Sequence, residues 1–447
     1  MVESFVQLKT LNIERCNELE EIIIVTEGLV EEEERMRKLV FPKLDRLKLR
    51  NLPKLKRFGF GNPIEFPSLT YLYIKGCPVL NTVHFDSTSV GTTVGNEAGK
   101  SSISMENLHS DVSKYLFSEK LAFPNLQQLH LGWDDGMKER LHGLRLASDY
   151  FCKLKVLGLV RFPQQLAIFP SYLFQLLSLP NLESLQIERC YFEELVFQSE
   201  GVGGEEKPAS ASMALSRLTE LRLSSLYELM HLWKEKEGFQ NLRILHVEGC
   251  PKLKSNLVPS SVCFQNLMTL EVYECDGIIK LVTHSTAKSL TQLREIRINY
   301  SRKIEEIIEG SDEDRDEVKD EIIFPKLNLL KLSGLSNLES FCSSGNQTFG
   351  FPSLATVIVN NCPKMKVFSK GGLNAPKLHK VRTYGWADEG DWIWEGNLNS
   401  TIQKLFTERK PVEEMEYSIE YQDNPSTSNT QVSQISFYKS SLPFIII

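Results

Sequence analysis

The sequence lacks long apolar runs and an excess of positive charge, and each absence excludes a class of protein. No run reaches the roughly 18 apolar residues that a membrane-spanning helix needs. The 447 residues carry a formal net charge of −7, whereas a general nucleic-acid binder has more Lys and Arg than Asp and Glu. The first residues also lack the basic and apolar segments of a signal peptide. We therefore expect no membrane span, no nucleic-acid partner and no secretion.

The motifs of enzymes and of metal sites are missing as well. The eight His and nine Cys residues form no H-E-x-x-H, no C-x-x-C and no other ligand spacing, and there is no G-x-S-x-G turn. The string from Gly95 to Ser101 is one residue short of a phosphate-binding loop, because Val94 stands where the first glycine is needed. The sequence predicts a protein without enzymatic activity, metal or cofactor, although a triad built from distant residues would leave no motif.

What the sequence does contain is a repeat. The stretch from Phe324 to Phe341 has the skeleton F-P-x-L-x-x-L-x-L-x-x-L-x-x-L-x-x-F, and the same skeleton starts again at Phe351. Such recurrence indicates one structural unit used many times. Thirteen units can be aligned, and they start at Phe5, Phe41, Phe66, Phe123, Phe151, Leu179, Leu215, Phe239, Phe264, Leu290, Phe324, Phe351 and Ala375.

The central L-x-L of each unit alternates with a period of two, which predicts a short strand whose apolar residues point inward. One strand per unit, stacked side by side, gives a parallel sheet. We therefore predict an α/β leucine-rich-repeat solenoid of the horseshoe type, with the parallel sheet on its concave face. Because the units differ in length after the strand, we expect irregular loops, turns and short helices on the convex face. The first unit begins without a polar cap, which predicts that the array continues in a longer protein.

Six of the nine cysteines occupy one slot of the repeat, three residues after the second apolar strand residue. An equivalent slot in stacked units points inward, where Cys acts as a small hydrophobic residue. We therefore expect reduced thiols in a cytoplasmic or nuclear protein. The six are Cys16, Cys77, Cys190, Cys250, Cys275 and Cys362.

Three regions follow from these patterns. The repeat array spans residues 1–383, with polar insertions near 84–122 and 198–214. Residues 384–410 are predicted to form a Trp-rich cap, in which a short helix covers the open end with Leu398, Ile402, Leu405 and Phe406 on one face. The tail, 411–447, is polar and predicted to be disordered. Two acidic runs, 31–34 and 312–321, are either solvated loops or partner-binding patches.

The middle residue of each predicted strand faces solvent on the concave side. In order these residues are Asn12, Lys48, Tyr73, His130, Gly158, Gln186, Arg222, His246, Glu271, Arg297, Lys331, Ile358 and Arg382. Seven are Lys, Arg or His and one is acidic. Two interpretations remain open at this point: exposed strand positions tolerate charge, or a basic column binds an acidic protein surface. The candidate binding residues are Lys48, Tyr71, Tyr73, Lys75, His130, Arg222, His246, Glu271, Tyr273, Arg297, Lys331 and Arg382.

Two sequence features carry a resemblance to a known family. One is the alternation of F-P-x-L-x-x-L-x-L-x-x-L-P-K-L (41–55) with L-x-I-x-x-C-P-x-L (72–80), and the other is W-x-W-E-G-N-L-N-S-T-I-Q-K-L-F from Trp392. Over roughly residues 1–410 the chain resembles the leucine-rich-repeat region of plant coiled-coil/nucleotide-binding/leucine-rich-repeat immune receptors. The resemblance implies a scaffold that senses a pathogen effector or a modified host protein and contacts a nucleotide-binding module. This chain lacks that module's phosphate loop. The alternative is a substrate adaptor of a ubiquitin ligase, which also uses such repeats.

Overall fold

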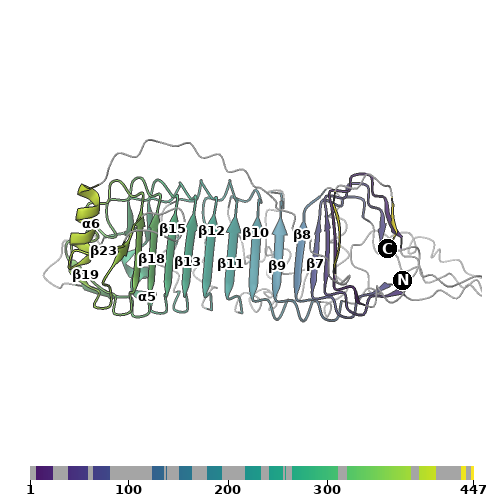
Figure 1. Ribbon diagram of the computed structural model, residues 1–447, viewed down its shortest axis with the longest axis horizontal. Helices are drawn as coiled ribbons and strands as arrows, with labels where there is room; N and C mark the ends of the chain where they lie inside the picture. The colour runs from purple at the N-terminus through teal and green to yellow at the C-terminus, as the bar shows by residue number, and fades with distance from the viewer. Residues whose placement is uncertain are drawn as a thin grey trace, which may run out of the picture. The chain divides into compact units, whose positions relative to one another are not determined.

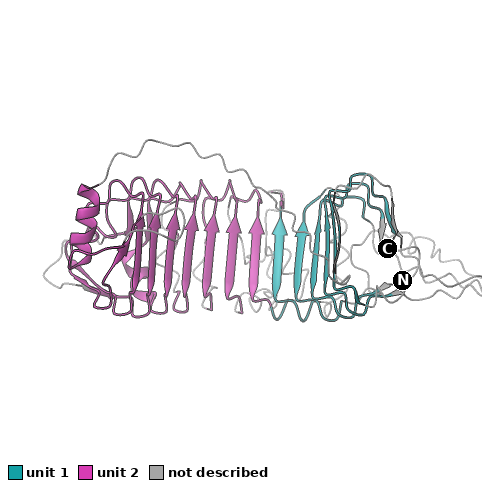
Figure 2. Ribbon diagram, in the orientation of Figure 1, with its two compact units in different colours: residues 1–160, 173–181, 430–447 teal, residues 161–172, 182–429 magenta. Residues whose placement is uncertain are grey.

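The computed structural model describes residues 7–23, 39–58, 64–80, 123–134, 137, 151–163, 179–193, 217–232, 241–254, 257, 264–310, 320–383, 392–408, 434–438 and 444–446. The chain divides into two compact units, which Figure 2 colours separately. Unit 1 comprises residues 1–160, 173–181 and 430–447, and unit 2 comprises residues 161–172 and 182–429. Each unit is described by itself below.

The main strands of both units run parallel, one for each predicted repeat (Figure 1). In unit 1 the order is β24-β1-β4-β7-β8-β9, with bounds Gln434–Tyr438, Thr10–Glu14, Arg46–Arg50, Tyr71–Lys75, Gln128–Gly132 and Val156–Val160. In unit 2 the order is β10-β11-β12-β13-β15-β18-β20-β22-β23. Its bounds are Ser184–Glu188, Glu220–Ser224, Ile244–Glu248, Thr269–Tyr273, Glu295–Asn299, Leu329–Ser333, Thr356–Asn360, Val381–Arg382 and Trp392–Ile393. Only β23 joins antiparallel.

The L-x-L alternation explains the register of these strands. Leu221, Leu245 and Leu270 are Cα partners in adjacent strands, and each is at most 1% exposed. Because side chains alternate between the two faces of a strand, stacking in this register places all the apolar positions in one continuous core. The parallel sheet, one main strand in each of thirteen units and the inward-pointing leucines are therefore confirmed.

The phenylalanines of the F-P motif form a second layer of the core. Phe324 stacks on Phe351 with ring centroids 5.5 Å apart, and Phe41 stacks in the same way on Phe66. Each ring packs on the equivalent ring of the next repeat, so the stacking recurs with the repeat. Phe324, Phe351, Phe41 and Phe66 are all at most 2% exposed. Repeated rings of this kind fix the spacing of the units behind the sheet.

The cysteine slot behaves as predicted. All six slot cysteines are at most 1% exposed and carry free thiols. Each thiol donates to the backbone carbonyl two residues before it, as in Cys275 Sγ to Tyr273 O at 3.3 Å. Burial raises the pKa of Cys190 to about 12, so this thiol stays protonated. The slot cysteines are packing residues, and among the described cysteines Cys152 is the exposed one.

Behind the main sheet, the structure adds short parallel strands to the predicted loops, turns and helices. In the described residues they form four groups: β17-β19-β21 and β14-β16 in unit 2, and β3-β6 and β25-β2-β5 in unit 1. Their bounds are β2 Glu21–Ile23, β3 Leu39–Val40, β5 Arg57–Phe58, β6 Ile64–Glu65, β14 Lys280–Val282, β16 Glu306–Ile308, β17 Asp320–Ile323, β19 Gln347–Gly350, β21 Leu373–Asn374 and β25 Phe444–Ile446. Helix α5 spans His284–Ser289. These strands are too short to show alternation, which explains why the sequence did not predict them.

The predicted terminal helix is present as α6, Leu398–Thr407. Leu398 and Ile402 are buried, whereas Leu405 and Phe406 are half-buried. The polar residues of the terminal motif have structural roles. The side chain of Asn397 caps the helix by accepting from Ser400 N–H, and Asn399 Oδ1 accepts from the N–H groups of Phe368 and Ser369. The Asn397 bond caps the helix itself, and the two Asn399 bonds hold the helix against the repeat that starts at Phe351.

The prediction of a disordered tail is wrong for two segments. Strand β24 (434–438) pairs with β1, and β25 (444–446) pairs with β2. The sequence analysis judged the tail by its mostly polar composition. These strands form through backbone hydrogen bonds to a distant segment, which local composition does not reveal. The rest of the tail lies outside the described residues. So do the insertions near 84–122 and 198–214, the string 95–101, and the acidic runs 31–34 and 312–319.

No helix among the described residues is long and apolar enough to cross a membrane.

Candidate protein-binding surface

The side of each main sheet opposite its core is built from strand positions one, three and five. We call it the unit 1 sheet face over β1, β4, β7, β8 and β9, and the unit 2 sheet face over β10 to β22. The sequence-derived column used position three alone. Charged residues at positions one and five lie beside it in the same strands, for example Arg46 and Arg50 around Lys48 in β4 and Glu295 beside Arg297 in β15. The surface is therefore three residues wide for each strand.

The unit 1 sheet face carries a cluster of cationic and aromatic side chains. The guanidinium of Arg46 lies 4.0 Å from the ring centroid of Tyr71, and Lys48 Nζ lies 5.6 Å from that of Tyr73. Both tyrosine rings also contact His130, with centroids 5.3 Å and 5.8 Å away. Cation–π and ring contacts of this kind hold large side chains in fixed positions. Four candidate residues, Lys48, Tyr71, Tyr73 and His130, are thus brought together.

Two glycines make room for this cluster. A Cβ added to Gly158 would lie 2.0 Å from His130 Nδ1, and one added to Gly132 would lie 2.6 Å from Lys75 Cγ. The imidazole and the lysine stem therefore lie flat across the neighbouring strand, where a larger residue would displace them. As a result Lys75 is only 6% exposed. The prediction that Lys75 is a surface binding residue does not fit this burial.

One carboxylate serves two cations of the unit 1 sheet face. Glu14 Oε1 lies 2.5 Å from Lys48 Nζ, and Glu14 Oε2 lies 3.5 Å from Arg50 Nη1. Burial acts to raise the pKa of Glu14, but the hydrogen bond and charge of Lys48, with Asn12 and Arg50, outweigh it and lower this pKa. Arg46 is exposed and has no carboxylate partner among the described residues. Arg46, Lys48 and Arg50 therefore outnumber the one carboxylate near them.

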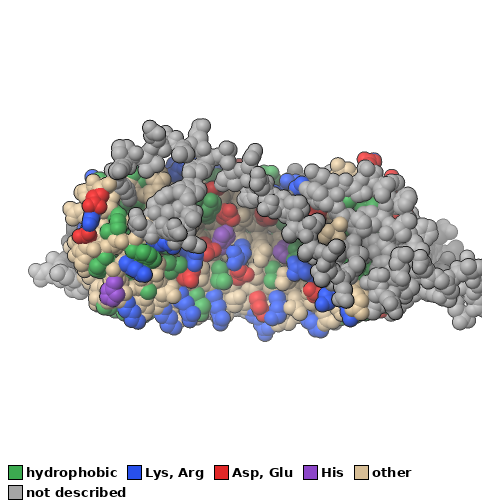
Figure 3. Space-filling model, viewed as in Figure 1, with side chains coloured by type: hydrophobic (Ala, Val, Ile, Leu, Met, Phe, Trp, Pro, Cys, Tyr) green, Lys and Arg blue, Asp and Glu red, His purple; other side chains and the backbone are tan. Residues whose placement is uncertain are grey.

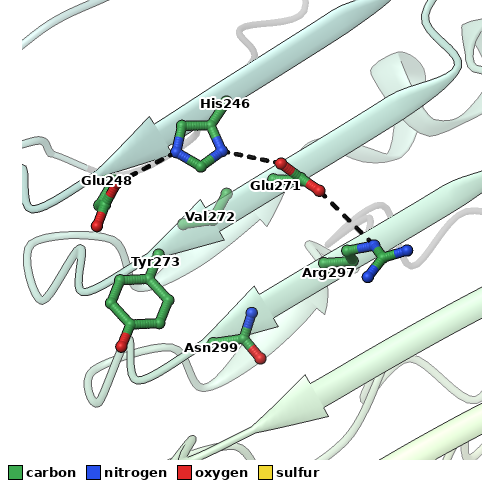
Figure 4. A pocket seen from close by; sticks show the side chains of 7 residues that line it. All are labelled: His246, Glu248, Glu271, Val272, Tyr273, Arg297 and Asn299. Carbon is green, nitrogen blue, oxygen red and sulfur yellow. Dashed lines mark hydrogen bonds and ion pairs between the residues drawn. The ribbon is translucent and has the colours of Figure 1, made fainter. Parts of the chain in front are cut away.

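The unit 2 sheet face holds a chain of ion pairs instead. His246 Nδ1 lies 2.9 Å from Glu271 Oε2, and the other oxygen of Glu271 lies 3.6 Å from Arg297 Nε. Arg297 Nη2 lies 2.7 Å from Glu295. Glu248 lies on the far side of the imidazole, 3.4 Å from Nε2. Figure 4 shows this row of side chains running across three neighbouring strands.

A hollow of about 230 Å³ lies beside this row of side chains. It is lined by His246, Glu248, Glu271, Val272, Tyr273, Arg297 and Asn299. Tyr273 meets Tyr300 edge-on, with ring centroids 5.3 Å apart, and Tyr300 is 48% exposed. Burial raises the pKa of Tyr273, and the nearby Glu274 adds to the rise. The hollow is thus bordered by a tyrosine pair that sequence analysis recognised only in part, because Tyr300 follows the strand in a left-handed turn (φ 54°) and does not belong to the alternating pattern.

The charges of the unit 2 sheet face contradict the premise of an uncompensated basic column there. Arg222 Nε lies 2.6 Å from Glu220, and Arg297 has two glutamate partners. Over β10 to β15 this face has the carboxylates of Glu188, Glu220, Glu248, Glu271 and Glu295 and the cations Arg222 and Arg297. Figure 3 shows acidic and basic side chains mixed over this sheet. The column of position three was basic only because the flanking glutamates were not counted.

The last two candidates differ from each other. Lys331 is half-buried, with no charged partner among the described residues. Arg382 lies 5.8 Å from the ring of Trp392, and Lys380 lies 4.0 Å from the same ring. The indole of β23 therefore borders the end of the column. Arg382 belongs to the terminal cap more than to a binding surface.

A further group of cations lies where the strands of unit 2 begin. Arg243, Arg294, Lys326 and Lys377 are all exposed and shortly precede their strands. Figure 3 shows Lys and Arg side chains along this lower edge. Their recurrence with the repeat was visible in the sequence, but they fall outside the L-x-L core that set the alignment.

Among the described residues, no group of three or more His, Cys, Asp or Glu side chains is arranged to hold a metal ion. What the two faces present are charged and aromatic side chains on a rigid sheet, which is the chemistry of protein recognition.

Comparison with known proteins gives a consistent picture. The family model "Plant disease resistance protein RPS2-like, leucine-rich repeats" matches residues 1–93, 125–263 and 256–370. Disease resistance protein RPS5 of Arabidopsis thaliana is 27% identical over 179 residues, which are 38% of this chain and 19% of the relative. Disease resistance protein UNI of the same plant is 32% identical over 163 residues, 36% and 17% respectively. A probable disease resistance protein of Arabidopsis thaliana is 27% identical over 183 residues, 41% and 19%.

The chain thus spans about a fifth of the length of these curated relatives. Among solved structures, the leucine-rich-repeat ectodomain of the plant membrane receptor kinase GASSHO1/SCHENGEN3 from Arabidopsis thaliana is 13% identical and covers 75% of this chain and 46% of its own. Its TM-score of 0.20 is too low to support a statement about fold or function. The fold rests on the strand order and register given above.

Proposed function

Because this chain belongs to the RPS2-like leucine-rich-repeat family of plant disease resistance proteins, we propose that it is a protein-recognition scaffold in plant defence. In this proposal it senses a pathogen effector or a modified host protein. It also contacts a nucleotide-binding switch module, for which this chain itself has no phosphate loop. The family match favours this function over that of a ubiquitin-ligase adaptor. The free, buried slot cysteines support a cytoplasmic or nuclear location.

The observation that carries the proposal is the cluster of the unit 1 sheet face. Tyr and Arg are the residue types that dominate the energetics of protein interfaces. Here they are already ordered before any partner arrives, because Arg46 stacks on Tyr71 and Tyr73 contacts His130. A preordered side chain loses little conformational entropy on binding. The cluster therefore has the composition and the rigidity of a recognition site.

The charge of the cluster indicates the kind of surface that it recognises. Lys48 and Arg50 share the single carboxylate of Glu14, and Arg46 has no carboxylate partner among the described residues, so the face attracts negative charge. An acidic protein surface would complement it, and complementary charge raises the association rate and excludes wrong partners. The unit 2 sheet face does not have this property, since Arg222 and Arg297 already have glutamate partners. We therefore assign the acidic partner surface to unit 1.

A binding screen with the full chain tests the proposal. The chain is immobilised and exposed to a panel of purified pathogen effectors, host proteins and a nucleotide-binding module of this receptor class, at low and high salt. The double variant Arg46→Glu/Tyr71→Ala identifies partners that need the unit 1 cluster. Arg222→Glu serves as the matched control, since Arg222 is also a sheet-face arginine but is paired with Glu220.

We expect a partner whose affinity falls with salt, falls in the double variant and stays near the wild-type value in the control. A partner that binds all three proteins equally would show that recognition uses another surface. A binder lost only in the Arg222 variant would place the site in unit 2.

A further inference from the structure

The N-terminal edge of unit 1 is covered by a segment from the other end of the sequence. Strand β24 pairs with β1 in parallel over its whole length, from Thr10↔Gln434 to Glu14↔Tyr438. Strand β25 pairs with β2, from Glu21↔Phe444 to Ile23↔Ile446. Figure 1 shows these yellow C-terminal strands beside the purple N-terminal ones. The segment thus contacts the edge repeat twice, once in each row of strands.

This double contact reproduces what a neighbouring repeat does. On its other side, β1 pairs with β4 over the same residues, and β2 pairs with β5. The interval along the chain between the first and the second strand is also nearly the same in all three pairs. The pairs of strand starts are Thr10 and Glu21, Arg46 and Arg57, and Gln434 and Phe444. Strands β24 and β25 therefore occupy the positions of the two strands of one repeat.

The residue pattern of the segment fits this path. Ile435 and Phe437 are the register partners of Leu11 and Ile13, both of which are fully buried. Strand β24 thus has apolar residues at positions two and four, as the other main strands do. Only one L-x-L-like element is present, without an F-P motif before it, so no repeat was recognised there from the sequence.

The pairing with β24 satisfies backbone groups at the edge of β1. Without β24, one side of β1 would present unpaired backbone N–H and C=O groups, and such an edge is a template for another strand. The pairing satisfies those groups with a segment of the same chain.

We infer that the edge formed by β1 and β2 is a strand-accepting interaction surface and that its occupant is the chain's own pair of strands, β24 and β25, which substitutes for the strands of a repeat. Any other repeat that docks on this edge needs the same backbone groups, so the two occupants exclude each other. The edge therefore accepts a parallel pair of short strands that follow each other along the chain at the interval of β24 and β25. This inference does not depend on the proposed function.

An engineered disulfide tests the register directly. Asn12 and Ser436 are Cα partners at the middle of the two strands. Paired parallel strands lie about 4.8 Å apart, which is within the Cα range of a disulfide, about 4.4–6.8 Å. The full chain with Cys152→Ser and Cys263→Ser is the background, because Cys152 is exposed. Into it, Asn12→Cys and Ser436→Cys are introduced together.

The matched control combines Asn12→Cys with Gln434→Cys. It is two residues out of register, so the Cα atoms would be about 8 Å apart, too far for a bridge. After mild oxidation of dilute protein, peptide mapping by mass spectrometry should find the 12–436 disulfide within one chain and little of the 12–434 bridge. Equal bridging in both proteins, no bridge in either, or bridges between chains would each overturn the inference.

Hydrogen exchange provides a second measurement on the intact chain. In the double variant Ile435→Asp/Phe437→Asp, the amides of β1 should exchange at least tenfold faster, while those of β12 and β13 keep their protection. A synthetic peptide of residues 430–447, added in excess, should restore the protection of β1. Unchanged exchange in β1, or a peptide without effect, would contradict an exchangeable strand at this edge.

Discussion

The two units share one strand pattern and differ in the balance of charge on their sheet faces. In unit 1, Glu14 pairs with Lys48 and Arg50, and the neighbouring Arg46 has no carboxylate partner among the described residues. In unit 2, Glu271 lies between His246 and Arg297, and further glutamates lie beside both of these side chains. Two of the five middle strand residues are basic in unit 1 and five of the eight in unit 2. The middle position alone would therefore make unit 2 the more basic face, and the residues at positions one and five reverse this. Charge on a repeat surface has to be counted over all the residues that face outward.

The ends of the two units differ in the same instructive way. Unit 2 ends in a local cap, in which Asn397 and Asn399 of the terminal motif bond to backbone groups of the cap and of the repeat that starts at Phe351. Unit 1 is closed by backbone pairing with a segment from the opposite end of the sequence. A side-chain clamp leaves a recognisable motif. Backbone pairing leaves little trace in sequence, because almost any residues can form it.

The largest effect is expected from a charge in the core of unit 2. Leu270 is 1% exposed, so Leu270→Asp buries a carboxylate without a partner and should cost about 3 kcal/mol or more in free energy of unfolding. Denaturant unfolding followed by hydrogen exchange measures it. The loss of protection should be greatest in β12, β13 and β15, because repeats are stabilised by their neighbours. Gln265→Asp in the same repeat is the control, as Gln265 is exposed. A uniform loss across β1 and β4 would show that the two units do not unfold separately.

The next largest effect is expected at the cap of unit 2 and should leave the strand-paired edge of unit 1 unchanged. Asn399→Ala removes the acceptor of two N–H groups, those of Phe368 and Ser369. We expect a loss of about 1–3 kcal/mol, seen as faster exchange in residues 368–383 with unit 1 unaffected. Ser400→Ala, in the same helix, leaves these bonds in place. Wild-type exchange in the Asn399 variant would mean that the helix stays docked by its apolar face alone.

The comparison of faces predicts a smaller, selective effect on binding. For a partner found in the screen, Arg46→Glu should weaken affinity about tenfold, or roughly 1.4 kcal/mol. Arg297→Glu should change it less than twofold, because Arg297 is engaged with Glu295 and Glu271. Titration calorimetry at two salt concentrations gives both values. The reverse order of effects would move the acidic partner's site to unit 2.

The smallest expected effect is the loss of stability at low pH that arises from Glu14. The pKa of Glu14 is lowered in the folded chain, so the unfolded chain binds a proton at this group more readily. The stabilisation is therefore present above the ordinary glutamate pKa and is lost as pH falls through the lowered value. We expect it to be below about 1 kcal/mol. Lys48→Gln should remove this pH dependence from β1 and β4 in hydrogen exchange between pH 6 and 3, whereas Lys54→Gln, whose partner is Glu18, should not. An unaltered acid profile in the Lys48 variant would contradict this origin.

The sequence predicted the main strands well, because each depends on a pattern repeated thirteen times. Every L-x-L, from Leu11 to Val381, proved to be a strand with a buried apolar face. The candidate surface was predicted less well. Tyr71, Tyr73 and His130 do lie in contact with one another. Lys75, however, is buried, because Gly132 leaves room for its side chain to lie flat across the neighbouring strand. The short strands behind the sheet and the ion pairs of Arg222 and Arg297 were missed.

By itself the sequence determined that the chain stacks as parallel repeats around leucine, phenylalanine and cysteine, because burial of apolar surface is specified by residue type and period. Only the tertiary structure decided how the charges pair. An ion pair depends on which side chains become neighbours across strands, and Glu271 meets His246 and Arg297 only after the repeats have stacked in register. It also decided that the tail closes the edge beside β1, because backbone hydrogen bonds between distant segments depend on geometry more than on residue type.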